Sequence, residues 1–293
     1  MKFTREFLSA CVACLLACAC AHAQTLERVF IKGSRLSYGG YTVTREVGGG
    51  ESRAVISRGR RELARLVSGA PRPEATRVGL FPMLGARGRQ LIVEQDTGGA
   101  HCCNIYRVYD LGAKLRTLFD GDEYGVEEVG GDMEVIDIDR DGRYEFTQSV
   151  MAFDYFLTSH AGSVFPVAVF AYDAGAGKYV PANKRFSSYL LRGVERDVRE
   201  AESMNRRTTR EEVASGFHGE HFRAVMNVLT KYVYAGEEEK GWAFFNTHYM
   251  LADKAEVEAA VKKRLRESAI YCAVYGCAPG EKEEAARSGF EKF

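Results

Sequence analysis

The sequence predicts an α+β protein, in which antiparallel all-β repeats at the N-terminus are followed by an α-helical C-terminal domain. As far as about Leu191, short β-rich runs are punctuated by glycine, which is typical of all-β structure. From about Thr208 onward, apolar residues recur at helical spacing. The chain has 293 residues, 46% of them hydrophobic and 27% charged. This composition supports a sizeable core and excludes disorder, collagen and coiled coil.

Residues 1–23 are predicted to be a secretory signal peptide. Lys2 and Arg5 precede an apolar run, and the small residues around His22 form a site that signal peptidase accepts before Gln24. The run is too short to span a bilayer, and no later stretch approaches ~20 consecutive apolar residues. We therefore expect a secreted or periplasmic protein without a transmembrane span.

An alternative localisation depends on Cys20. The segment 16–20 resembles a bacterial lipobox, which would make Cys20 the lipidated first residue of a membrane-anchored lipoprotein. Ala17 stands where lipoboxes usually carry leucine. The signal peptide that ends before Gln24 is the preferred interpretation.

Four cysteines remain once the predicted signal peptide is removed, and an oxidising compartment favours disulfides among them. We expect Cys272 to pair with Cys277 across a short loop. The adjacent Cys102 and Cys103 could form a vicinal disulfide, remain thiols or bind a metal.

The β-rich domain is predicted over residues 24–192. Its expected strands lie at residues 29–31, 41–43, 54–56, 91–93, 106–109, 134–136 and 167–170. Two blocks of sequence recur inside it: 88–92 matches 142–146, and 109–114 matches 172–178. A fainter third copy covers 54–66. Repeats of this kind indicate propeller-blade-like sheets or stacked meanders, and they leave open whether the sheets close into a ring.

The helical domain is predicted over residues 208–293, after a charged junction at 193–207. Thr208 with Glu211, and Thr209 with Glu212, have the spacing of a capping box. The apolar residues expected to share one helix face are Phe222, Val225, Met226, Leu229 and Val233. Asp253 begins a second helix, with Val257, Val261 and Leu265 on one face.

One loop carries the chemistry of a metal site. Asp137, Asp139 and Asp141 alternate, a glycine follows, and Glu145 adds a fourth carboxylate. Ca²⁺ takes six to eight oxygen ligands, which such a loop supplies together with a backbone carbonyl, expected from Arg143. Four acids in nine residues also repel one another unless a cation neutralises them. The alternative is a solvated acidic turn, because Asp and Gly also favour turns.

The loop is not an EF-hand, because the twelfth position from Asp137 is Gln148 and the flanks are β-rich. It resembles the FG-GAP or VCBS type of calcium-binding repeat. The resemblance is specific over 134–146, loose over 76–190, and does not extend to the helical half. It implies that Asp137, Asp139, Asp141 and Glu145 are calcium ligands, the last being Glu where Asp is common.

A second candidate site is the turn His101-Cys102-Cys103. Imidazole and thiol groups are suitable for zinc binding or redox chemistry. A periplasmic hydrolase or a thiol- or metal-dependent enzyme using this turn is therefore the alternative to a non-catalytic protein. A structural role for the cysteines is also open.

The charges cancel, with 40 Lys and Arg against 40 Asp and Glu. No overall positive field exists to hold nucleic acid, so we expect no nucleic-acid partner. The predicted function is a secreted or periplasmic non-catalytic protein whose calcium-stabilised β domain binds a protein or glycan of the cell envelope.

Overall fold

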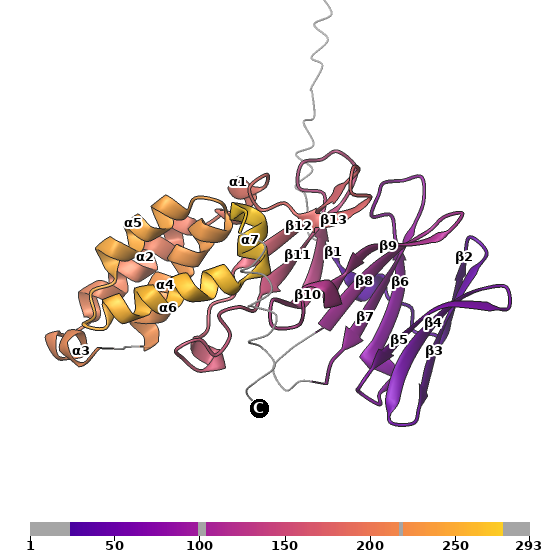
Figure 1. Ribbon diagram of the computed structural model, residues 1–293, viewed down its shortest axis with the longest axis horizontal. Helices are drawn as coiled ribbons and strands as arrows, with labels where there is room; N and C mark the ends of the chain where they lie inside the picture. Colours follow the sequence, from indigo (N-terminus) through magenta and orange to yellow (C-terminus); the bar gives the residue numbers. More distant parts are fainter. Residues whose placement is uncertain (1–23, 99–103, 217–218, 278–293) are drawn as a thin grey trace, which may run out of the picture.

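A computed structural model describes residues 24–98, 104–216 and 219–277. It confirms the α+β prediction, because three antiparallel sheets occupy the N-terminal part and helices follow (Figure 1). The sheets stand one after another in chain order, and the helices lie beyond the third sheet.

Each sheet is built on a four-stranded antiparallel meander. The first contains β2 (Arg35–Tyr38), β3 (Tyr41–Gly48), β4 (Glu51–Arg58) and β5 (Arg61–Ser68). The second contains β6 (Thr76–Phe81), β7 (Gln90–Asp96), β8 (Asn104–Leu111) and β9 (Leu115–Asp120). The third contains β10 (Val129–Ile136), β11 (Glu145–Val150), β12 (Val167–Asp173) and β13 (Lys178–Pro181), and β1 (Gln24–Thr25) pairs with its β10 edge.

The sequence repeat coincides with this structural repeat. The matched blocks 88–92 and 142–146 each lead into the second strand of a sheet, β7 and β11 respectively. The blocks 109–114 and 172–178 each hold the turn between the third and fourth strands. The fainter copy at 54–66 is the β4–β5 hairpin, which occupies the same place in the first sheet.

The faces between neighbouring sheets form the core of the β half. Buried aliphatic side chains such as Val43, Ile56 and Val93 fill the space between the first and second sheets. Stacked and edge-on rings of Phe119, Phe146 and Phe170 join the second sheet to the third. Burial alternates at the start of β3 in the first sheet, whereas every residue of β7 except the last is buried, because the second sheet is covered on both faces.

One expected strand is not formed. Residues 29–31 follow a 3-10 turn at Leu26–Arg28, and Phe30 contacts Gly79 of β6 through an isolated bridge. A Cβ at Gly79 would come within 2.6 Å of the Val29 carbonyl oxygen, so only glycine permits this close approach. The chain therefore crosses β6 at one point instead of pairing along it.

The helical half contains α1 (Ser187–Leu190), α2 (Val194–Arg207), α3 (Arg210–Ser215), α4 (Gly219–Tyr234), α5 (Glu238–His248), α6 (Lys254–Glu267) and α7 (Ala269–Tyr275). Residues 194–207, within the predicted junction at 193–207, form helix α2. Val194 and Ala201 bury a narrow apolar stripe of α2 against Val228 of α4. The dense charges on the other faces of α2 hide that stripe in the sequence.

Several helical predictions are confirmed, but Thr208 ends α2 instead of forming a capping box with Glu211, and Asp253 makes no side-chain cap to α6. Thr209 caps α3 through a complete capping box with Glu212. The five apolar residues expected on one face of α4 are all buried, as are those of α6. Helix α4 also packs on the third sheet, where Ala235 just after it joins Val169 of β12 in one cluster.

The predicted disulfide between Cys272 and Cys277 is present at the end of α7. Among the described residues, no helix is both long and apolar enough to cross a membrane.

Candidate metal centre

The acidic loop connects β10 to β11 in the third sheet. Asp137 directly follows the last residue of β10, and Glu145 is the first residue of β11. Between them, Arg140 at φ 63° and Gly142 at φ +82° adopt left-handed backbone conformations. These two positions turn the loop back on itself, so that carboxylates eight residues apart meet.

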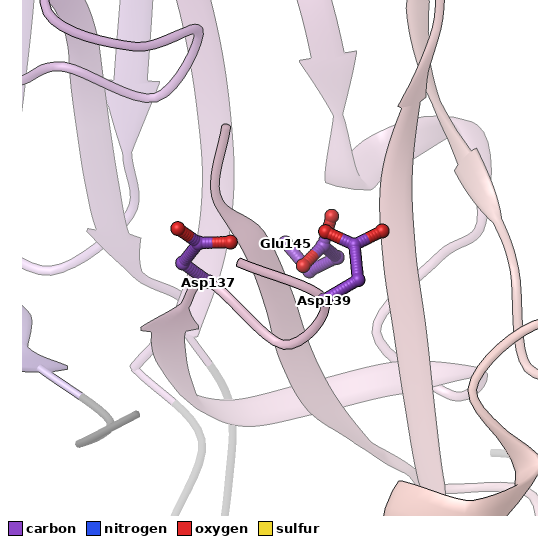
Figure 2. Close-up of side chains that lie close together, drawn as sticks. All are labelled: Asp137, Asp139 and Glu145. Atoms are coloured by element: carbon purple, nitrogen blue, oxygen red, sulfur yellow. The ribbon is translucent and has the colours of Figure 1, made fainter. Parts of the chain in front are cut away.

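Three of the four predicted carboxylates converge. Asp137, Asp139 and Glu145 each offer an oxygen, and these oxygens all lie within 4.8 Å of one another (Figure 2). All the donors in this group are hard oxygen atoms, the ligands that Ca²⁺ and Mg²⁺ prefer.

The Asp137 carboxylate is only half satisfied by the protein. Its Oδ2 accepts a hydrogen bond from the Gly142 N–H at 3.1 Å. Its Oδ1 is buried and has no hydrogen-bond partner among the described residues. A buried, unpaired carboxylate oxygen is unfavourable unless a proton, water or cation satisfies it.

Glu145 is 3% exposed, and its Oε2 accepts a hydrogen bond from the Ile138 N–H at 2.9 Å. Burial, with a smaller contribution from the neighbouring Asp139 charge, raises the pKa of Glu145 to about 7. The folded chain thus holds this proton more tightly than the unfolded chain does. In the metal-free protein, its contribution to stability is complete below pH 4.5 and is lost as the pH rises toward about 7.

Asp139 has a cationic neighbour that the sequence did not indicate. Its Oδ2 forms an ion pair with Arg185, which lies between β13 and α1. Its Oδ1 accepts a hydrogen bond from the Asp141 N–H at 3.3 Å. Arg185 compensates one of the negative charges in the cluster, and both partners of this pair are partly exposed.

Asp141 and Arg143, the other two predicted ligands, form a local turn with each other. Asp141 lies outside the carboxylate cluster. Its Oδ1 accepts a hydrogen bond from the Arg143 N–H at 2.8 Å, and its Oδ2 lies 3.5 Å from the Arg143 guanidinium. The hydrogen bond from the Arg143 N–H places the Asp141 carboxylate in a local turn, outside the group of three.

The loop rests on the second sheet through contacts that sequence reasoning missed. The Tyr144 N–H donates to the Met83 carbonyl at 2.9 Å. The hydroxyl of Tyr179 on β13 reaches the carbonyls of both Tyr144 and Met83. A Cβ at Gly85 would lie 3.1 Å from the Gly142 carbonyl oxygen. The acidic loop, which is the β10–β11 connection, therefore packs against the β6–β7 connection.

The turn His101-Cys102-Cys103 lies outside the described residues. The enzymatic alternative that depends on it remains a prediction.

No family model, curated protein or solved structure matches the chain.

The affinity of this cluster for a divalent cation such as Ca²⁺ is expected to fall as the pH drops below about 7, because Glu145 must lose its proton to act as a ligand. Displacement of one proton weakens binding by up to about tenfold per pH unit below that pKa. Calorimetric titrations at pH 6 and pH 8, in buffers of different ionisation enthalpy, measure both the affinity and the released proton. Glu145→Gln should bind more weakly but without this pH dependence. A wild-type affinity that is equal at both pH values contradicts the expectation.

Proposed function

We propose that this chain is a non-catalytic binding protein, secreted or periplasmic, whose β half is stabilised by one Ca²⁺ held by Asp137, Asp139 and Glu145. The observation that carries the proposal is the buried Oδ1 of Asp137, which lacks a partner among the described residues and belongs to a group of three converging carboxylates. A divalent cation would satisfy that oxygen and relieve the repulsion among the acids.

Calcium is favoured over other cations by the donor set. Zinc sites are usually built from Cys and His, and this cluster contains carboxylates alone. Mg²⁺ demands a near-ideal octahedron, which a flexible acidic loop is poorly suited to provide. Ca²⁺ accepts irregular sets of six to eight oxygens, so backbone carbonyls and water would complete its coordination.

The ion would act through the junction between two sheets. The loop that carries its ligands contacts Met83 and Gly85 of the neighbouring sheet. Fixing this loop would hold the third sheet in a fixed position against the second. The other loops would remain free to bind a partner. The proposed role of the ion is therefore structural support for a binding surface.

Isothermal titration calorimetry tests the proposal directly. We expect the mature chain to bind one Ca²⁺, and to bind Mg²⁺ much more weakly. Asp137→Asn should lose most of the affinity, because it weakens the only ligand whose buried oxygen lacks a partner within the described part of the chain. The matched variant is Asp173→Asn, which lies in a turn of the same sheet outside the cluster. If the wild-type chain shows no heat of calcium binding, the proposal is wrong and the loop is a solvated acidic turn.

The exported chain is expected to begin at Gln24. The boundary after residues 21–23 supports this, and intact mass spectrometry of protein recovered from the expressing cell checks it. A mass that includes an acyl chain on Cys20 would instead establish the lipoprotein alternative. A retained N-terminal segment would contradict both.

A further inference from the structure

The overall neutrality of the chain conceals an uneven distribution of charge. Residues 34–120, which hold the first two sheets, contain 14 Lys and Arg but 8 Asp and Glu, a net charge of +6. The rest of the chain carries 26 basic and 32 acidic residues, a net charge of −6. The first two sheets are therefore a basic body within a neutral protein.

The topology gathers the hairpin turns of these sheets at one end. In a four-stranded meander the first and third connections lie at the same end, because successive strands run in opposite directions. Side-by-side contacts confirm this placement across sheets. The Arg58 guanidinium donates to the Ala113 carbonyl at 2.5 Å, and a Cβ at Gly39 would lie 3.2 Å from the Leu111 carbonyl oxygen. Figure 1 shows these turns along the upper side of the β half.

Six exposed basic side chains stand on these turns, and we refer to them as the basic turn face. They are Arg58, Arg60, Arg61, Arg87, Arg89 and Lys114. Within the described parts of the chain, none of the six forms an ion pair. Two acids of the same sheets are already engaged, since Glu62 pairs with Arg65 and Asp110 pairs with Arg116.

The arrangement is unfavourable for the isolated fold. Arg58 and Arg61 are direct cross-strand partners in the β4–β5 hairpin, and like charges in that position destabilise a hairpin. Arg58 relieves part of the repulsion by lying over the Tyr41 ring at 5.1 Å. A cluster of exposed basic side chains without ion-pair partners among the described residues is the electrostatic pattern of a surface that meets an anionic partner.

We propose that the basic turn face binds an anionic polysaccharide. Five of the six groups are guanidinium forks, which match sulfate, carboxylate or phosphate oxygens in bidentate fashion. The inference names a partner for the proposed binding role. Its residues are not ligands of the proposed calcium site and it requires no metal, although the β6–β7 connection that carries Arg87 and Arg89 also contacts the acidic loop.

Two other polyanions fit this face less well. A membrane-binding surface combines basic residues with inserted apolar ones, and single-stranded nucleic acid needs exposed rings for base stacking. The exposed large apolar side chains of the described chain are Val47, Val67, Tyr155, Leu157, Val167 and Met250. None of them lies on the turns that carry the basic turn face.

Fluorescence anisotropy with labelled dextran sulfate tests the inference on the full mature chain, with neutral dextran as the uncharged reference. EGTA is present throughout, so that no calcium ion can bridge the polyanion to the acidic loop. We expect saturable binding to dextran sulfate and none to neutral dextran. The logarithm of the binding constant should fall linearly with the logarithm of the salt concentration, and the magnitude of that slope should decrease by about one for each basic contact that a variant removes. The triple variant Arg60→Gln, Arg87→Gln, Arg89→Gln should lose about tenfold or more in affinity.

The matched control is Arg199→Gln, Arg206→Gln, Arg207→Gln on α2, which removes three exposed arginines and the same net charge. We expect its affinity to stay within about twofold of the wild type. The pair Arg87→Gln, Lys114→Gln serves if the first triple variant misfolds.

Equal weakening in both triple variants, or no preference for dextran sulfate over neutral dextran, overturns the inference. So does tighter binding to a DNA duplex or to phosphatidylglycerol vesicles. If the chain binds dextran sulfate but no calcium, the proposed metal site is wrong and this inference stands. If it binds calcium but not dextran sulfate, only this inference is wrong.

Discussion

Calcium is expected to raise the melting temperature of the protein, and chelation to lower it again. An ion that binds the folded chain and not the unfolded chain stabilises it by mass action, by about 2.7 kcal/mol at a free concentration 100 times the dissociation constant. For a chain of this size, that corresponds to a shift of several degrees. Differential scanning calorimetry with added CaCl₂ and then with EGTA measures it.

The variant Asp139→Ala separates a bound ion from a general salt effect. It removes one of the three converging carboxylates and frees Arg185, so most of the calcium response should disappear. Asp173→Ala provides the control, because its carboxylate accepts a turn hydrogen bond from Ala176 and takes no part in the cluster. A calcium response that survives in Asp139→Ala contradicts the assignment. So does a response in the wild type that MgCl₂ reproduces in full.

Local patterns in the sequence were sufficient for the secondary structure and for most of the loop. Alternating carboxylates followed by glycine predicted where the chain would turn and which acids would approach one another, and Asp137, Asp139 and Glu145 do converge. The equal spacing of Val257, Val261 and Leu265 predicted a buried helix face, because helical periodicity depends only on near neighbours.

Contacts between distant segments could not be predicted in this way. The Tyr179 hydroxyl reaches the Met83 carbonyl across 96 positions of sequence, and Arg185 reaches Asp139 across 46. Both depend on how the sheets stack, which no local pattern encodes. The local turn of Asp141 with Arg143 is a different case, because it joins near neighbours and the spacing of the carboxylates did not indicate it. The role of Asp141 as a ligand stays a prediction.

One such distant contact joins the two halves of the molecule. Glu128, just before β10, is 8% exposed, and its Oε1 accepts hydrogen bonds from the Ser268 hydroxyl at 2.5 Å and from the Ile270 N–H at 2.9 Å. Ser268 caps α7 and in turn accepts a hydrogen bond from the Tyr234 hydroxyl at 2.8 Å. A single carboxylate thus ties the third sheet to the start of α7.

Glu128→Ala is expected to destabilise the protein by about 3 kcal/mol at neutral pH, because it leaves a buried hydroxyl and a buried N–H without their acceptor. Glu128→Gln keeps an acceptor oxygen in place, so its cost should be smaller, about 1 kcal/mol or less. Urea unfolding of both variants measures these differences. The neighbouring exposed Glu127→Ala is the control, and it should change stability by no more than about 0.5 kcal/mol.

The pH dependence distinguishes the charge of Glu128 from its shape. Burial raises the pKa of Glu128 above its ordinary value of 4.5, so the folded state holds the proton more tightly than the unfolded state. The resulting stability is complete below pH 4.5 and is lost as the pH rises through the folded pKa. Glu128→Gln lacks this loss, so its stability relative to the wild type should improve between pH 4.5 and pH 7.5. Glu145 titrates in both proteins and cancels from the difference. A stability difference that stays constant with pH would contradict the raised pKa of Glu128. An alanine variant as stable as Glu127→Ala would show that this carboxylate does not hold the two halves together.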